Sequence, residues 1–151
     1  MAAATSGERR EARTLSAPAL FRAGRFTGRT TVHILTFDDL RSRPGSVARF
    51  QGVDHDATTS FYVVSSAPGR GAAKHRHPYE EIFVILGGDI EVEVDGERGR
   101  LGAGHVVVIP PRTWHAFTNR GSTDASMVNI HASATMIQED WDVVVRGDAR
   151  G

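Results

Sequence analysis

The clearest pattern along the chain is a strict alternation of apolar and acidic residues from Asp89 to Asp95. Ile90, Val92 and Val94 fall on one side of an extended chain, and the acidic residues fall on the other. A strand with this alternation has one buried face and one face in water. Asp95-Gly96 is a residue pair typical of tight hairpin turns. The pattern therefore predicts a hairpin whose first strand is half buried.

Similar β-type segments recur at short intervals along the chain. They are rich in β-branched and aromatic residues, and they are separated by turn residues such as Arg43-Pro44-Gly45 and Gly87-Gly88. Many short strands separated by such turns favour an all-β sandwich or barrel. The other predicted strands are Thr30 to Thr36, Ser60 to Ser65, Glu81 to Leu86, Arg100 to Leu101, His105 to Ile109, His115 to Asn119 and Met127 to His131, and a short helix is predicted from Ala134 to Trp141.

The composition restricts the class of protein. A chain of 151 residues is long enough for one domain with its own core. Basic and acidic residues number 18 each, so no net charge directs the protein to nucleic acid or to anionic membranes. The absence of cysteine removes disulfides and thiolate ligands. The longest apolar run, Ile82 to Leu86, is too short for a membrane span, and residues 1–13 do not resemble a secretory signal, so a cytoplasmic protein is expected.

The candidate chemistry lies in four residues: His75, His77, Glu81 and His115. His75 and His77 are two positions apart, so on an extended chain both imidazoles point to one side, as two ligands of one ion require. Glu81 keeps this parity, although Pro78 bends the chain between them. Imidazoles and a carboxylate suit a divalent ion such as iron, manganese, nickel, cobalt or zinc. The sequence thus predicts a metal site and leaves the ion open.

The residues around these four ligands resemble the two signature motifs of the cupin superfamily. The first motif reads Gly69-x5-His75-x-His77-x3-Glu81-x6-Gly88, and the second reads Gly104-x5-Pro110-x-Arg112-x2-His115-x3-Asn119. The resemblance covers about half of the chain, roughly Thr58 to His131. It implies a double-stranded β-helix, a small jelly-roll barrel whose metal ligands project into the interior.

The chain is expected to have three parts. Residues 1–28 are predicted to be a mobile or docking N-terminal tail, residues 29–142 the cupin β-barrel domain, and residues 143–151 a C-terminal tail. The stretch from Leu15 to Phe26 is the part of the first tail that is expected to dock on the domain or on a partner subunit. Small cupins of this type often dimerise through exchanged N-terminal strands, so the resemblance implies a homodimer.

One position departs from the second motif, because Arg112 stands where the motif normally has Gly. Gly at that position supplies the positive φ of a type II turn, whereas Pro110-Pro111-Arg112-Thr113 suits a type I turn. We therefore predict a type I turn. Arg112 is either a solvated turn residue or a contact for an anionic substrate at the barrel mouth.

Other residues are candidates for the substrate pocket. Asn129 and His131 share one side of their strand, and if that side faces the barrel, His131 is a candidate base near the metal. The alternative for His131 is a surface or packing role. Aromatic candidates for the pocket wall, each of which has an ordinary core position as its alternative, are Tyr62, Phe83, Trp114 and Phe117.

Three kinds of function are compatible with this site. Three imidazoles and one carboxylate leave two positions open on an octahedral ion. With a redox-active ion, Fe(II) being favoured, such a site suits a dioxygenase acting on a small organic molecule, which is the leading hypothesis. With a redox-silent ion it suits a Lewis-acid isomerase, epimerase or lyase. A non-catalytic binding or sensor protein is the third hypothesis.

Overall fold

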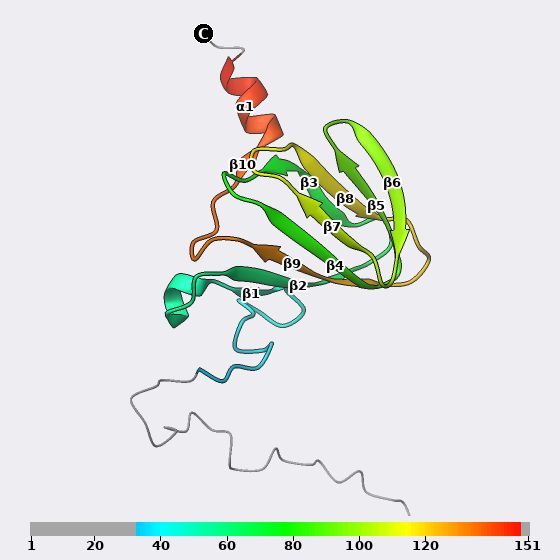
Figure 1. The fold of residues 1–151 in the computed structure, drawn as a ribbon. Coiled ribbons are helices and arrows are strands. Elements are labelled where there is room, and N and C mark those ends of the chain that lie inside the picture. Colours follow the sequence, from blue (N-terminus) through cyan, green and yellow to red (C-terminus); the bar gives the residue numbers. More distant parts are fainter. Residues whose placement is uncertain (1–32, 149–151) are drawn as a thin grey trace, which may run out of the picture. The chain divides into compact units, whose positions relative to one another are not determined.

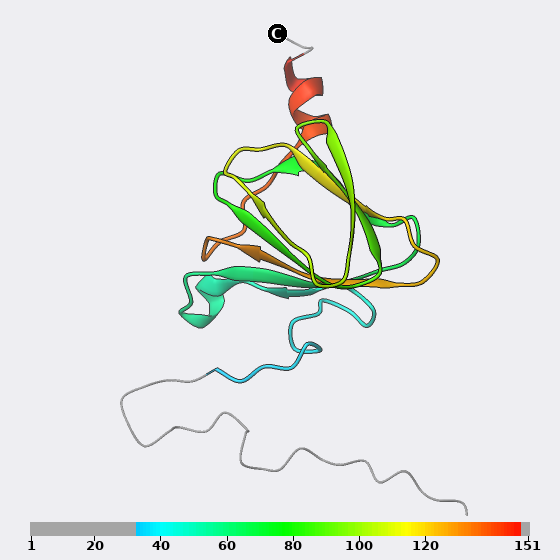
Figure 2. The same cartoon turned by 45° about the vertical axis from the view of Figure 1, so that its right-hand side comes forward.

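Two five-stranded antiparallel sheets form the body of the molecule in our computed structural model, which describes residues 33–148 (Figure 1). Sheet A has the strand order β1-β2-β9-β4-β7, and sheet B has the order β10-β3-β8-β5-β6. Figure 2 shows the two sheets as opposite walls of a barrel. The predicted all-β, double-stranded β-helix with a short C-terminal helix is therefore confirmed.

The strands are short and are joined by tight turns. In chain order they are β1 (Ala48–Phe50), β2 (Ser60–Ser66), β3 (Gly71–Arg76), β4 (Glu81–Gly87), β5 (Asp89–Val94), β6 (Glu97–Gly102), β7 (Val106–Ile109), β8 (His115–Asn119), β9 (Ala125–His131) and β10 (Glu139–Asp140). A 3-10 helix η2 (Gly52–His55) precedes β2, and the helix α1 (Trp141–Asp148) follows β10. None of the helices between residues 33 and 148 is long and apolar enough to cross a membrane.

The predicted hairpin is present between β5 and β6. Val94 pairs with Glu97, which leaves Asp95 and Gly96 as a two-residue turn. Both turn residues have positive φ, 49° and 91°, as the tight turn of a twisted hairpin requires. Ile90 and Val92 are at most 4% exposed, so the apolar side of the alternating strand faces the core.

The core lies between the two sheets. Inward side chains from both sheets pack together there, among them Phe83, Ile85 and Met127 of sheet A and Ile90 and Phe117 of sheet B. Each of these side chains is at most 5% exposed. The four predicted ligands are buried as well, so the interior combines this apolar core with a group of buried histidines and one glutamate.

Two predicted elements differ from the structure. Residues 33–36 of the predicted strand Thr30 to Thr36 are not in a strand, and the rest of that segment lies outside the described residues. The Asp39 carboxylate accepts hydrogen bonds from the Thr36 backbone N–H and hydroxyl, both at 2.7 Å, and so stabilises a turn instead. Residues 1–28, predicted to be the N-terminal tail, also lie outside the described range.

The C-terminal helix lies later in the chain than predicted. It was predicted from Ala134 to Trp141, whereas α1 begins at Trp141. The segment from Ala134 to Gln138 is irregular, and β10 pairs with β3 before α1 begins at Trp141. The Tyr79 hydroxyl accepts a hydrogen bond from the Ile137 N–H at 2.8 Å and donates one to the Ile137 carbonyl at 3.1 Å. These contacts with another part of the chain hold residue 137 in a non-helical conformation. The predicted C-terminal tail, residues 143–151, is helical as far as residue 148.

Candidate metal centre

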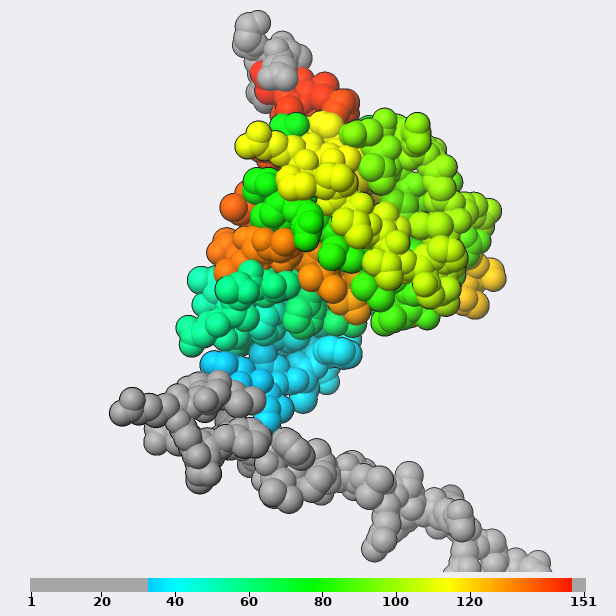
Figure 3. Space-filling model, in the orientation of Figure 1, coloured from blue at the N-terminus to red at the C-terminus, as the bar shows by residue number. Residues whose placement is uncertain are grey.

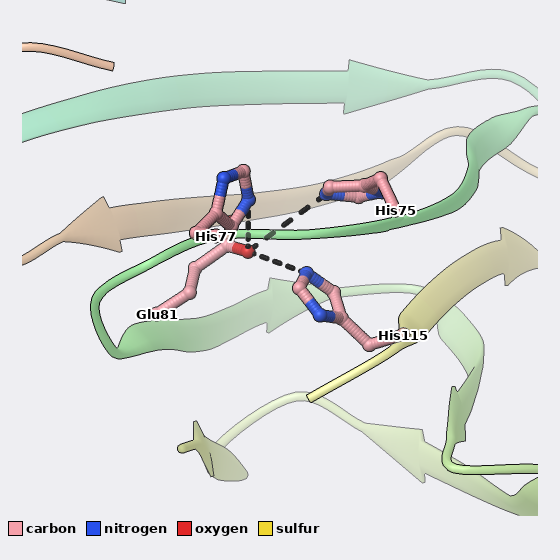
Figure 4. Close-up of side chains that lie close together, drawn as sticks. All are labelled: His75, His77, Glu81 and His115. Atoms are coloured by element: carbon pink, nitrogen blue, oxygen red, sulfur yellow. Dashed lines mark hydrogen bonds and ion pairs between the residues drawn. The ribbon is translucent and has the colours of Figure 1, made fainter. Parts of the chain in front are cut away.

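Three strands bring the four predicted ligands together. His75 lies near the end of β3 and pairs with His115 at the start of β8, while His77 follows β3 and Glu81 is the first residue of β4. Figure 4 shows the Glu81 carboxylate among the three imidazoles. One potential ligand atom from each residue lies within 4.8 Å of the others, and all four residues are at most 6% exposed. We call these four residues the histidine-glutamate cluster.

Backbone carbonyls orient the three imidazoles of the cluster. The Nδ1–H groups donate to the carbonyl oxygens of Ala73, Ile137 and Thr113, at 2.6 Å from His75, 2.6 Å from His77 and 2.9 Å from His115. A neutral imidazole with its proton on Nδ1 has a lone pair on Nε2. The three Nε2 atoms therefore point toward the cavity as lone-pair donors, which is the orientation that metal-binding histidines have.

The centre of the cluster needs positive charge. Glu81 Oε2 lies 2.7 Å from His115 Nε2, 3.1 Å from His77 Nε2 and 4.0 Å from His75 Nε2. Burial by itself raises the pKa of Glu81, but the hydrogen bond from His115 and the nearby imidazoles of His77 and His131 lower it to about 2. The hydrogen bond from His115 requires a proton on its Nε2, whereas burial lowers the pKa of His75 and so disfavours a second proton on that ring.

A divalent ion fits this requirement. A bound ion would accept the three Nε2 lone pairs, and its positive charge would balance the negative charge of the Glu81 carboxylate. The unpartnered Nε2 of His77, buried among the described residues, is consistent with this fit. The donor set of imidazole nitrogens and carboxylate oxygen is compatible with iron, manganese, cobalt, nickel and zinc.

His131 lies beside the cluster and is not one of its four members. It is the last residue of β9, pairs with Glu81 across the sheet, and is 2% exposed. Its Nε2 is 3.3 Å from Glu81 Oε1, but neither ring nitrogen has a hydrogen-bond partner among the described residues. Burial is the main reason that the pKa of His131 falls to about 4. The imidazole is therefore neutral near pH 7 and has both nitrogens available.

A cavity of about 460 Å³ opens onto the cluster. It contacts His75 and Glu81, and four of the predicted pocket residues line it, namely Tyr62, Phe117, Asn129 and His131. Its wall also includes Val64, Ala72, Arg70 and Gln138, which the sequence reasoning missed. The sequence pattern could have indicated Val64, because Val64 lies two positions after Tyr62 and therefore on the same side of β2. No local pattern marks the other three.

Three residues predicted for the pocket lie elsewhere. Phe83 has no exposed surface and packs in the core against His115 and Phe117, with ring centroids 5.9 Å and 5.6 Å away. Trp114 contacts Trp141 of α1 and the Arg76 guanidinium. Arg112 lines a separate, polar cavity of about 360 Å³ beside His77. Phe83 and Trp114 are thus packing residues, and Arg112 does not reach the larger cavity.

The turn before His115 also differs from the prediction. Arg112 has a φ of 63°, so it takes the left-handed conformation that Gly takes in a type II turn, and the predicted type I turn is wrong. Its N–H donates to the His77 carbonyl at 2.7 Å, which connects this turn to the chain between two ligands. This long-range hydrogen bond offsets the local preference of a non-glycine residue for negative φ.

The chain is similar to several known sequences. Residues 62–131 match the family described as Cupin domain, a range that contains all four members. The chain is 36% identical to Protein SchB of Streptomyces halstedii over 101 residues, which is 63% of this chain and 73% of that protein. It is 42% identical to polyketide synthase CurC of Streptomyces cyaneus over 48% of each chain. It is 40% identical to gentisate 1,2 dioxygenase 1 of Aquipseudomonas alcaligenes over 41% of this chain and 19% of that protein.

Solved structures agree with the fold. An oxalate oxidase superposes with a TM-score of 0.59 at 23% identity over 73% of this chain and 68% of the other. The oxalate decarboxylase of Lactobacillus farciminis superposes with a TM-score of 0.64 at 21% identity over 73% of this chain and 36% of the other. At these identities the structural likeness concerns the barrel, and the reactions of those enzymes do not transfer with it.

Proposed function

Because the chain belongs to the cupin family, we propose that it is a metal-dependent enzyme that oxidises a small organic molecule with dioxygen at the histidine-glutamate cluster. One observation carries the proposal. Three Nε2 lone pairs and one buried carboxylate point to the same place at the edge of the cavity. The likeness to a gentisate dioxygenase, which covers 41% of this chain, supports the choice of an oxidation.

The histidine-glutamate cluster would hold one divalent ion, for which Fe(II) is favoured because dioxygen chemistry needs a redox-active metal. When bound, such an ion activates dioxygen and polarises a substrate that lies next to it. The chain itself contributes the arrangement around that position. The Ala73, Thr113 and Ile137 carbonyls fix the ligand imidazoles, and the buried surroundings exclude bulk water from Glu81.

The cavity favours a substrate with an apolar body and an acidic group. Tyr62, Val64 and Phe117 provide apolar surface to the cavity, and His75, Glu81 and Asn129 provide polar groups. Arg70 also lines the cavity, is exposed, and takes part in none of the ion pairs found among residues 33–148. A carboxylate or phenolate on the substrate would complement this guanidinium. A hydroxylated aromatic acid has all these features.

An oxygen-uptake assay tests the function. Protein purified without chelator is expected to contain iron or manganese and to consume dioxygen with a hydroxylated aromatic acid. Arg70→Gln is expected to raise KM for the acid by about tenfold and to leave KM for the corresponding neutral phenol unchanged. Protein that contains metal but consumes no dioxygen with any member of a phenolic acid panel would contradict the oxidation, and an equal effect on both KM values would contradict the role of Arg70.

His131 is proposed as the base that takes a proton from the substrate. It lines the cavity, is neutral near pH 7, and neither of its ring nitrogens forms a hydrogen bond with the described residues. His131→Ala is expected to lower kcat by about 100-fold or more while metal content stays the same. Metal analysis and turnover measured on one preparation separate the two effects. Unchanged turnover would remove His131 from the reaction.

A redox-neutral reaction is the second candidate. The likeness to polyketide synthase CurC, which covers about half of each chain, supports it, since a neutral base beside a Lewis-acid metal suits isomerisation or elimination as well as oxidation. This alternative predicts zinc or nickel in the purified protein and turnover that is the same under anaerobic conditions.

A further inference from the structure

One of the three imidazoles of the histidine-glutamate cluster is oriented by a distant part of the chain. His75 and His115 each donate their Nδ1–H to a backbone carbonyl two positions earlier in the same segment. His77 donates instead to the Ile137 carbonyl, 60 positions later in the chain, at 2.6 Å. Local backbone geometry therefore fixes the first two rings, whereas the direction of the His77 Nε2 lone pair depends on where residue 137 lies.

Residue 137 belongs to the irregular segment 132–138, which joins β9 to β10 on one side of the barrel (Figure 1) and which we call the strap. Gln138 at the end of the strap lines the cavity, so the strap forms part of the cavity wall. Ile137 is 50% exposed, and atoms of the chain after β9 begins, coloured orange, reach the molecular surface in Figure 3. Burial of the Ile137 side chain therefore does little to hold residue 137 in place.

Both ends of the strap are attached to the barrel. The Ser60 hydroxyl of β2 bonds two backbone carbonyls near the start of the strap, at 2.7 Å and 3.0 Å. Directly after the strap, β10 pairs with β3, and Glu139 forms an ion pair with Arg76 at 2.7 Å. Residue 137 lies between these attachments, so its own contacts must set the position of the carbonyl that orients His77.

Tyr79 contacts both residue 137 and His77. Its hydroxyl donates to the Ile137 carbonyl at 3.1 Å and accepts a hydrogen bond from the Ile137 N–H at 2.8 Å. Its ring stacks on the His77 imidazole, with ring centroids 5.4 Å apart and an interplanar angle of 2°. The hydroxyl thus fixes both polar backbone atoms of residue 137, and the ring restricts rotation of the imidazole that this residue orients.

We propose that Tyr79 is a positioning residue of the metal centre, which holds the Ile137 carbonyl where it directs the His77 Nε2 lone pair toward the cluster. The inference rests on the proposed function only in that an ion binds at the cluster. Tyr79 acts through His77 and is not a ligand itself, because its hydroxyl already donates to one backbone atom of residue 137 and accepts from the other.

Nuclear magnetic resonance of the metal-free full chain tests the positioning without any ion. The His77 Nδ1–H of the wild type is expected to exchange slowly with water, because it is buried and bonded to the Ile137 carbonyl. Tyr79→Phe keeps the ring and removes the hydroxyl, and it is expected to speed this exchange about tenfold.

The matched control for this experiment is Ser133→Ala. It removes a hydroxyl that bonds the Thr135 carbonyl and N–H within the strap, away from His77, and it should leave the exchange of the His77 Nδ1–H unchanged. Equally slow exchange in Tyr79→Phe and wild type, or equal acceleration in Tyr79→Phe and Ser133→Ala, would overturn the proposal.

Titration of the full chain with Co(II) alone gives the second result. Tyr79→Phe is expected to weaken Co(II) binding about tenfold, as loss of a group that orients a ligand does, and to shift the visible absorption of the bound ion, which reports the geometry of its ligands. Tyr79→Leu also removes the stacked ring and should weaken binding further, whereas Ser133→Ala should bind Co(II) like wild type.

The outcomes of the titration separate this proposal from the proposed function. Co(II) affinity and absorption that are the same in Tyr79→Phe and wild type would overturn the role of Tyr79 and leave the metal centre intact. A wild type that binds no Co(II) would overturn the metal centre, and with it both the proposed function and the effect of Tyr79 on metal binding.

Discussion

Replacing His115 with Ala is expected to remove most of the bound metal from the purified protein. The substitution deletes an Nε2 donor that lies 2.7 Å from Glu81 Oε2 at the centre of the cluster. Loss of a residue that only orients a ligand typically weakens metal binding about 10- to 100-fold, so loss of the ligand should weaken it at least as much. Metal content per chain, measured by elemental analysis, should fall from about one ion to a small fraction.

Thermal unfolding gives the second measure of the same loss. An ion present at 100 times its dissociation constant stabilises the folded state by about 2.7 kcal/mol. For a chain of this length, that corresponds to a rise in Tm of roughly 5 to 11 °C, which His115→Ala should abolish.

Two further variants control for the fold and for the residue type. Glu81→Gln keeps the shape of the side chain and removes its charge, so it should lose metal without leaving a cavity in the core. His105→Ala removes an exposed imidazole whose Nδ1 bonds the Gly102 carbonyl outside the cluster, and it should bind metal like wild type. Full metal content in His115→Ala and Glu81→Gln would contradict the assignment of the cluster.

The metal-free protein is expected to lose stability in two steps as the pH falls. Burial lowers the pKa of His131 from its ordinary 6.5 to about 4, so folding favours the neutral imidazole. That contribution is complete above pH 6.5 and is lost as the pH falls from 6.5 to about 4. At about 1.4 kcal/mol for each tenfold change in proton affinity, the first step amounts to about 3 kcal/mol.

Glu81 is responsible for the second step. Its pKa is lowered from 4.5 to about 2, so folding favours the carboxylate. Its contribution is present above pH 4.5 and is lost between pH 4.5 and about 2. Both groups therefore act in the same direction, and acid destabilises the fold through both of them.

Urea unfolding in the presence of a chelator, repeated from pH 7 to pH 4, measures the first step. His131→Gln cannot titrate, so its free energy of unfolding should change much less over this range than that of wild type. A wild-type free energy of unfolding that is the same at pH 6.5 and pH 4.5 would contradict the buried neutral state of His131.

Local sequence patterns predicted the strands that alternate or are continuously apolar. The acidic and apolar alternation after residue 88 and the Asp95-Gly96 turn led directly to the β5–β6 hairpin, because both depend only on neighbouring residues. The segments around β2, β4 and β9 were also predicted nearly to their ends. The parity of His75 and His77 pointed to one shared side, and the structure brings both to the same point as Glu81 and His115.

Apart from the turn that Asp39 stabilises at Thr36, the errors come from contacts between distant parts of the chain. Tyr79 holds residue 137 out of a helix, and the His77 carbonyl holds Arg112 at positive φ. The pocket residues Arg70 and Gln138 come from loops that meet only when the barrel closes. None of these interactions leaves a periodic signal in the sequence, because each depends on a partner more than thirty positions away or on the packing of loops.

The sequence by itself determined which residues alternate, where the chain turns and which four side chains have the chemistry and parity of a metal site. These properties follow from backbone geometry over a few residues and from the donor atoms of each side chain. Only the tertiary structure decided that three backbone carbonyls orient the imidazoles toward Glu81, and that His131 lies buried beside them. Strand pairing decides these features, because it sets which faces meet and which remain open.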